Sequence, residues 1–252
     1  MRADHDPSLD YDPRSLEALS GLERYHGWIR AAFGAVLRGR VAEVGAGTGN
    51  FSVTWVDGAD EATLIEPAPQ LYGALSQRFA GRKNVKVVGA TLEEALARGD
   101  LAPGSLDALV MVNVLEHVED DLGELRRIRS ALRPGGAVAL FVPAIQAIYG
   151  SLDALVGHHR RYERDGLARV VREAGFEVEV LRWFDVAGVI PWWLVGKVMR
   201  ARSFGGPLGP IYDRVVVPVM SRVESVVAPP VGKNLLCVAR SPRDTKGSSE
   251  AR

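Results

Sequence analysis

The sequence has a single cysteine, no net charge and no long apolar run. With one cysteine among 252 residues, neither an internal disulfide nor a cysteine-based zinc site is expected, and a reducing, cytoplasmic location is the default expectation. The 31 basic and 31 acidic side chains balance. Since proteins that bind phosphate backbones normally carry a basic surplus, we expect no nucleic-acid partner. No segment reaches the roughly 20 apolar residues of a membrane span, and the first residues do not resemble a signal peptide.

Strand-like and helix-like segments alternate along most of the chain. Short apolar runs predict strands over residues 40–44, 62–66, 85–88, 106–112, 137–142, 176–183 and 234–239. Amphipathic spacing predicts helices over about 15–37, 70–79 and 92–97, one that contains Leu122, Leu125, Ile128 and Leu132, and one that contains Leu167, Val170, Val171 and Ala174. The Pro134-Gly135-Gly136 turn should end the helix through Leu132. This alternation is typical of an α/β protein whose parallel sheet is covered by helices on both faces.

The two ends and one long connection do not follow this alternation. Residues 1–14 and 241–252 are polar and rich in charge, so we expect flexible tails around a single domain over 15–240. The connection over about 186–232 is too long for a hairpin and carries apolar patches, which predicts an inserted helical cap. Three roles remain open for its aromatic residues: a lid over an apolar substrate, a dimer contact, or a helix over Pro191–Met199 that lies in a membrane surface.

A glycine-rich loop follows the first strand. Gly45, Gly47 and Gly49 allow a tight turn with positive φ and let a ligand approach the backbone, but their spacing is not the G-x-G-x-x-G of a dinucleotide site. Glu43 precedes the loop, and its carboxylate suits an ammonium or sulfonium group better than a polyphosphate. Glu66 ends the next strand, where a carboxylate can accept hydrogen bonds from both ribose hydroxyls. The loop therefore predicts a site for an adenosine-bearing cofactor with a cationic arm.

Three motifs together resemble the class I S-adenosylmethionine-dependent methyltransferases. They are Glu43-Val-Gly-Ala-Gly-Thr-Gly-Asn50, Asn113-Val-Leu-Glu-His-Val-Glu-Asp120 and Leu132-Arg-Pro-Gly-Gly136, and the similarity covers about residues 20–185 and the last strand. The resemblance implies an α/β, Rossmann-like seven-stranded sheet in the order 3-2-1-4-5-7-6, with the last strand antiparallel and the helical insertion before it. It also implies S-adenosyl-L-methionine (SAM) as the cofactor.

The resemblance further implies which residues hold SAM. The glycine loop would line the methionine arm, with Glu43 near its amino group and Glu66 on the ribose. Thr91 or nearby backbone would replace the acidic residue that the family often places against the adenine. For Tyr25 and Trp28, packing against the sheet is an equal alternative to covering the cofactor. The complete implied set is Tyr25, Trp28, Glu43, Gly45, Ala46, Gly47, Gly49, Asn50, Glu66, Pro67, Thr91, Leu92, Asn113, Val114 and His117.

Candidate catalytic residues follow the fourth and fifth strands. A sulfonium methyl is already activated, so the protein mainly aligns the reactants, and a base is needed only when the acceptor carries a proton. His117 is the first candidate for that base, with contact to the cofactor pocket as its alternative role. Further along the chain, His158, Arg161 and Tyr162 offer donors for an anionic or phenolic acceptor. The alternative there is a solvated basic turn whose arginines pair with nearby acids such as Glu163.

A metal site is the weaker interpretation of the same residues. Some methyltransferases of this family bind Mg²⁺ through a glutamate, a Glu-His pair and a later histidine. Glu116, His117 and either His158 or His159 match part of that set. Asn113 stands where the first carboxylate would be, and an amide is a poorer ligand for a hard dication. We therefore expect no metal.

The sequence thus predicts an enzyme that transfers a methyl group from SAM to a small, partly apolar metabolite. Oxygen is the favoured acceptor, and carbon and nitrogen are the alternatives. A non-catalytic module of the same fold that binds SAM or S-adenosylhomocysteine is the competing hypothesis, whereas the glycine spacing and Glu43 disfavour a nicotinamide oxidoreductase. A homodimer and membrane contact are left open.

Overall fold

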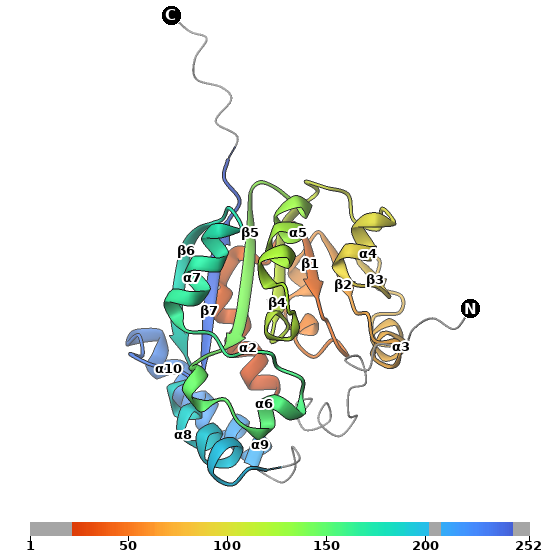
Figure 1. The fold of residues 1–252 in the computed structure, drawn as a ribbon. Coiled ribbons are helices and arrows are strands. Elements are labelled where there is room, and N and C mark those ends of the chain that lie inside the picture. The colour runs from red at the N-terminus through yellow and green to blue at the C-terminus, as the bar shows by residue number, and fades with distance from the viewer. Residues whose placement is uncertain (1–21, 202–207, 244–252) are drawn as a thin grey trace, which may run out of the picture.

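Seven strands form one sheet in a computed structural model that describes residues 22–201 and 208–243 (Figure 1). The strand order is β3-β2-β1-β4-β5-β7-β6, and β7 runs antiparallel to both of its neighbours while the other pairs are parallel. This arrangement confirms the predicted fold class. The strands are β1 Arg40–Val44, β2 Glu61–Ile65, β3 Val85–Val88, β4 Leu106–Val112, β5 Leu132–Pro143, β6 Glu177–Phe184 and β7 Asn234–Arg240.

Helices cover both faces of the sheet, with α4, α5 and α7 in front of it and α2 behind it in the view of Figure 1. The α-helices in the described part of the chain are α2 Glu23–Phe33, α3 Pro69–Arg78, α4 Leu92–Ala97, α5 Asp121–Ala131, α6 Ser151–Leu155, α7 Arg164–Glu173, α8 Val189–Trp192, α9 Leu208–Ile211 and α10 Val217–Val226. Two π-helical turns, η8 Trp193–Val198 and η9 Tyr212–Val216, continue α8 and join α9 to α10.

Successive residues of the central strands belong to two different cores. In β5, Val138 and Leu140 pack with residues of α4, α5 and α7, whereas Ala139 and Phe141 pack with residues of α2 and α3. This alternation follows from the two-residue period of a strand, and burial of both faces explains why β4 and β5 are almost entirely apolar. The parallel strands end together at one edge of the sheet, where an open α/β sheet binds its ligands.

The predicted elements agree closely with the structure, apart from one boundary and the tails. Leu132, which we placed on a helix, is instead the first residue of β5 and pairs with Leu106. The helix ends at Ala131, and Pro134 disfavours its continuation. Residues 1–14, and the part of the first predicted helix before residue 22, lie outside the described residues. We expected the second tail to begin at Ser241. The backbone N–H of Ser241 instead donates to the Gly136 carbonyl, so the chain stays hydrogen-bonded to β5 one residue beyond the end of β7.

The insertion over 186–232 is helical in its described parts, and Figure 1 shows it beyond the carboxyl ends of the parallel strands. Its two ends meet at Asp185, which is fully buried. The Asp185 carboxylate accepts hydrogen bonds from the hydroxyls of Tyr25 and Tyr212 and the N–H of Gly188, and it lies 3.2 Å from Lys233 Nζ. The Lys233 N–H also donates to the Asp185 carbonyl at 3.0 Å. No helix among the described residues is long and apolar enough to cross a membrane.

Candidate functional site

The glycine loop begins directly after β1 and is tied to the end of β2. The Gly45 N–H donates to the Ile65 carbonyl at 2.9 Å. The predicted positive φ is confirmed, at 70°, 58° and 82° for Gly45, Gly47 and Gly49. A Cβ on Gly45 would lie 2.5 Å from Val114 Cγ2, so glycine is required where the loop meets the chain that leaves β4. A Cβ on Gly47 would meet nothing within 4 Å, so this part of the loop is open to a ligand.

Two buried carboxyl groups lie beside this loop. Glu66 accepts hydrogen bonds from the N–H of Gly47 at 2.8 Å and of Ala68 at 2.9 Å. Burial raises the pKa of Glu66 above its ordinary value, although these two hydrogen bonds act to lower it. Glu43 is 2% exposed and accepts a bond from Trp55 Nε1 at 2.9 Å. Burial raises the pKa of Glu43 to about 8, so a cation beside it would be needed to keep it ionised at neutral pH. This donor set fits a cofactor with a ribose and a cationic arm.

The other residues expected near the cofactor include several with partners of their own. Asn50 Oδ1 accepts a bond from Arg78 Nη1 at 2.7 Å. Thr91 caps α4: its Oγ1 accepts from the Glu94 N–H at 3.2 Å, while the Thr91 N–H donates to the Glu94 carboxylate at 2.9 Å. Leu92 is buried at the start of the same helix. These contacts fix the position of Asn50 after β1 and of Thr91 and Leu92 after β3.

The chain that leaves β4 passes beside the loop. Asn113 is exposed and adopts a left-handed backbone conformation with φ 53°, which asparagine tolerates better than most residues. Val114 follows it and closes against Gly45, as described above. Ala46 is buried within the loop, and Pro67 is half-buried after Glu66. The implied cofactor residues of β1, β2 and β4 thus surround a single edge of the sheet.

Tyr25 and Trp28 pack inside the protein, which is the alternative to covering the cofactor. They form an aromatic cluster with Phe141 and Phe184, in which the rings of Trp28 and Phe184 lie 4.1 Å apart between centroids. The Tyr25 hydroxyl donates to Asp185 Oδ2 at 3.0 Å, which uses its only hydrogen. We therefore leave both residues out of the proposed cofactor site, because their side chains are buried and the polar atom of Tyr25 is occupied.

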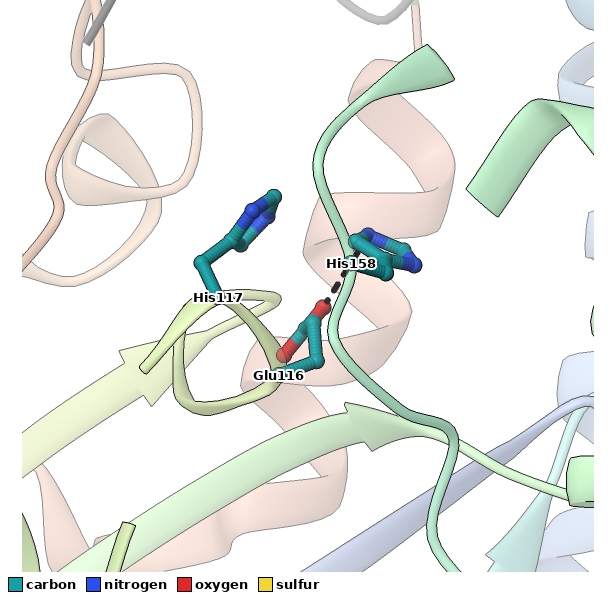
Figure 2. A group of neighbouring side chains, drawn as sticks. All are labelled: Glu116, His117 and His158. Carbon is teal, nitrogen blue, oxygen red and sulfur yellow. Dashed lines mark ion pairs between the residues drawn. The ribbon is translucent and has the colours of Figure 1, made fainter. Parts of the chain in front are cut away.

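Glu116, His117 and His158 converge beyond the end of β4, as Figure 2 shows. Glu116 and His117 belong to the 3-10 turn η5 Leu115–His117, and His158 lies in the segment after α6. One ligand atom of each residue lies within 4.8 Å of the others. His158 Nε2 is 3.6 Å from Glu116 Oε1, and the two histidine rings meet edge to face at 4.7 Å. The side chains that we assigned to catalysis from separate motifs are therefore brought together, and their donor set could also hold a divalent cation.

Asp153 fixes the orientation of His158. Burial acts to raise the pKa of Asp153, but hydrogen bonds from His158 and Arg161 hold it below its usual value, so this carboxylate is ionised and only accepts. His158 Nδ1, 2.9 Å from Asp153 Oδ1, must then carry the hydrogen, and its Nε2 faces Glu116. Burial raises the pKa of Glu116 to about 8 and lowers that of His117 to about 4, so both side chains are mostly neutral at pH 7.

Arg161 and Tyr162 are used inside the protein, which corrects our expectation that they bind the acceptor. The buried guanidinium of Arg161 donates to Asp153 Oδ1 at 2.7 Å and to the carbonyls of Ala144 and Lys233. The Tyr162 hydroxyl donates to Asp121 Oδ2 at 2.9 Å, and burial together with this carboxylate raises its pKa. We withdraw Tyr162 from the catalytic set. The alternative of a solvated turn is also wrong, since Arg161 and Tyr162 are 3% and 5% exposed.

Asp153 is the functional residue that our sequence reasoning missed. It also accepts bonds from the N–H of Gly150 at 3.0 Å and from Trp192 Nε1 at 3.2 Å, and it is fully buried. An acidic residue between Leu152 and Leu155, on a short apolar helix just before the histidines, was the signal that would have marked it.

Parts of this chain are similar in sequence to known proteins. A family model described as a methyltransferase domain matches residues 19–181. The ubiquinone biosynthesis O-methyltransferase of Xanthomonas euvesicatoria pv. vesicatoria (strain 85-10) is 29% identical over 169 residues, which span 61% of this chain and 67% of that protein. Fumosorinone synthetase of Cordyceps fumosorosea (strain ARSEF 2679) is 32% identical over 109 residues, which span 41% of this chain but only 3% of that protein.

The solved structures show the same fold. A crystal structure of an S-adenosylmethionine-dependent methyltransferase from Mesorhizobium loti superposes with a TM-score of 0.58 at 17% identity, and the match covers 84% of this chain and 95% of that one. Its low identity limits that comparison to the fold. Because the family model spans more than half of the sequence, the chain belongs to the methyltransferase domain family, and it is a class I S-adenosylmethionine-dependent methyltransferase.

Proposed function

We propose that this protein methylates a small, partly apolar metabolite at oxygen, with His158 as the general base. The observation that carries the proposal is the Asp153–His158 pair, which lies against Glu116 and His117 beyond the end of β4. A histidine held by a buried carboxylate through Nδ1 presents Nε2 as a proton acceptor. The name of the Xanthomonas relative supports an oxygen acceptor. Nitrogen and carbon acceptors are the alternatives, and a cytoplasmic location is part of the same proposal.

The cofactor would be held by the loop after β1 and its two carboxyl groups. When bound, SAM would supply a methyl group from a positively charged sulfur, whose bond to the methyl carbon breaks to leave the neutral thioether S-adenosylhomocysteine. Glu66 lies where a carboxylate can accept bonds from ribose hydroxyls, and its present partners are the N–H groups of Gly47 and Ala68. Glu43 is buried with a raised pKa, and a nearby ammonium group would return it to the ionised form.

On the acceptor side, the residues of this chain move one proton. His158 would take the acceptor's hydrogen at Nε2 as the new carbon–oxygen bond forms. Asp153 would stabilise the resulting imidazolium, and Arg161 keeps Asp153 in place with a 2.7 Å bond. His117, neutral at pH 7, packs against the His158 ring and limits its rotation. Positioning and exclusion of water supply the rest of the rate enhancement.

The test compares two adjacent histidines with an oxygen acceptor such as a catechol or a phenol. We expect His158→Gln to lower turnover by about 100-fold or more, which is typical for loss of a general base, without changing the affinity for S-adenosylhomocysteine. His159→Gln is the matched control because His159 is exposed and its backbone N–H, which the variant keeps, donates to the Glu116 carbonyl, so turnover should hold. Equal activity in both variants would remove His158 from the mechanism.

Cofactor binding is tested separately by calorimetry. We expect Glu66→Ala to weaken the binding of S-adenosylhomocysteine by about 10- to 100-fold, the usual effect of removing a charged hydrogen-bond acceptor. An unchanged affinity would remove Glu66 from the ribose. Binding without turnover across a broad panel of acceptors would favour the non-catalytic module instead.

A further inference from the structure

The insertion exposes an unusual number of large apolar side chains. Among the described residues, only Tyr72, Leu155 and Val180 are exposed large apolar side chains outside it. Within it, the exposed set comprises Ile190, Trp193, Leu194, Val198, Met199, Ile211, Val215, Val219, Val223, Val226, Val227 and Val231. Exposed apolar residues that gather in one region mark an interaction site more often than residues that are scattered singly.

One apolar stripe runs along the outer side of the helix formed by α9, η9 and α10. Ile211, Val215, Val219, Val223 and Val226 follow one another at spacings of four, four, four and three, and their exposed fractions range from 48% to 85%. Such spacing keeps the side chains on one face of a helix.

The opposite side of this helix is already occupied. Asp213 accepts hydrogen bonds from the backbone N–H groups of Arg24 and Tyr25 at the start of α2, Val217 is in the core, and Glu224 accepts from the N–H of Asp185. Because the inner side faces the protein, the apolar stripe has no use in holding the fold together.

A second stripe lies on α8 and η8. Ile190, Trp193, Leu194 and Val198 are exposed at spacings of three, one and four, while Gly196 is buried on the other side. Figure 1 shows α8 near α9 and α10, at the same end of the molecule. Both helical segments of the insertion, α8–η8 and α9–η9–α10, therefore have an inner side that packs on the protein and an exposed apolar outer side.

The charges around these stripes have one sign. Lys197, Arg200, Arg214 and Arg222 are exposed. In the described parts of the insertion, the two acidic side chains, Asp213 and Glu224, are each 4% exposed and bind backbone N–H groups. The exposed charge of this region is thus basic in a chain whose net charge is zero.

A groove beside α10 adds to this charge. It runs between α2 and α10, and its lining includes Arg24, Arg182 and Arg222. Three guanidinium groups next to an apolar helix face suit the phosphate groups of lipids.

We propose that the outer side of the insertion, residues 186–201 and 208–232, docks on an anionic lipid bilayer. Apolar side chains would enter the boundary between headgroups and acyl chains, and the basic side chains would contact anionic headgroups. A second copy of this chain is a poorer occupant, because a twofold contact would set four basic side chains against the same four, with no exposed carboxylate to pair them.

Docking would bring the acceptor side of the molecule to the bilayer. The Ser151 hydroxyl lies 2.9 and 2.7 Å from the carbonyls of Gly196 and Ala201 and donates its one hydrogen to either, and Trp192 Nε1 donates to Asp153. The insertion is thus joined directly to the segment that carries His158. The inference does not depend on the proposed function, since vesicle binding and methyl transfer are measured separately.

The first experiment is flotation of the full chain with vesicles of phosphatidylcholine, with and without about 30% phosphatidylglycerol. We expect binding that needs the anionic lipid and weakens with salt. Val219→Asp with Val223→Asp should reduce it about tenfold or more, as should Arg214→Gln with Arg222→Gln. The controls are Val180→Asp on β6 and Arg126→Glu on α5, also exposed, which should bind like the unchanged chain.

The second experiment locates Trp193, which is 44% exposed. Its fluorescence should be quenched by lipids brominated along the acyl chain, and Trp193→Phe should lose that quenching. Absence of binding to the anionic vesicles, or equal binding by the stripe variants and the controls, overturns the proposal. So does a dimer in light scattering without lipid that Val219→Asp with Val223→Asp dissociates. Circular dichroism of each variant confirms that it is folded.

Discussion

The two halves of the site are held together in different ways. On the cofactor side, the two carboxyl groups bond to residues close in sequence: Gly47 bonds to Glu66, 19 positions away, and Trp55 bonds to Glu43, 12 positions away. On the acceptor side, Asp153 bonds to Trp192, 39 positions away, and Arg161 to the Lys233 carbonyl, 72 positions away. The carboxyl groups of the cofactor half are therefore held locally, with Val114 against Gly45 as a longer-range contact, whereas the acceptor half depends on the insertion being in place.

The largest expected effect is at Asp153, a fully buried carboxylate with four hydrogen-bond partners: Gly150, His158, Arg161 and Trp192. Asp153→Asn should lower the free energy of unfolding by about 3–5 kcal/mol, because it leaves the Arg161 guanidinium buried without its counter-charge. Glu179→Gln is the control, since Glu179 pairs with the partly exposed Arg240 and should cost about 1 kcal/mol or less. Chemical denaturation measures both values. Equal costs would show that the acceptor half does not depend on this carboxylate.

A smaller effect is expected in the local half, at Gly45. Gly45→Ala should cost about 2–4 kcal/mol, because it combines an unfavourable φ with a contact against Val114. Gly99→Ala, just after α4, has a similar φ of 75° and nothing within 4 Å of the added Cβ, so it should cost only about 1–2 kcal/mol. Thermal unfolding of the two variants separates backbone strain from packing. If Gly99→Ala were as costly, the contact with Val114 would play no part.

The third prediction concerns the pH dependence of stability. The pKa of Glu43 is about 8 when folded, against an ordinary value of 4.5. Between these values the unfolded chain releases a proton that the folded chain keeps, so the free energy of unfolding should fall as pH rises through this window. Glu43→Gln cannot titrate and should flatten that slope. Urea denaturation across the window measures it, and an unchanged slope would mean that Glu43 is ionised in the folded protein.

The smallest expected effect is that of removing metal ions. Although Glu116, His117 and His158 lie close enough to be ligands, Asn113 stands where the resemblance to metal-dependent methyltransferases would require a further carboxylate. Dialysis against a chelator should therefore leave turnover unchanged. A loss of activity that added Mg²⁺ or Zn²⁺ restores would instead identify the three residues as a metal site.

The difference between short-range and long-range contacts also explains which parts of the site could be predicted from the sequence. The positive φ of Gly45 and Gly47 and the position of Glu66 follow from short-range patterns, and the strand order followed from the family resemblance. The role of Asp153 depends on Trp192 and Arg161, which only the tertiary structure brings to it.

For Asp153 we missed a functional residue, whereas for Tyr162 we predicted a function that the structure does not support. The Tyr162 hydroxyl donates to Asp121, 41 positions earlier, and nothing in the sequence indicates this pairing. A partner far along the chain decided both cases, Trp192 for Asp153 and Asp121 for Tyr162.

The meeting of both ends of the insertion at Asp185 has a consequence for changes in the length of the insertion. Since Asp185 and Lys233 are joined at the base, the insertion leaves the sheet and returns to it at one point, and β6 and β7 pair directly on either side of it. A change in the length of the insertion therefore need not change the register of these two strands. What such a change must preserve is the inner side, where Asp213 binds the start of α2 and Val217 packs in the core.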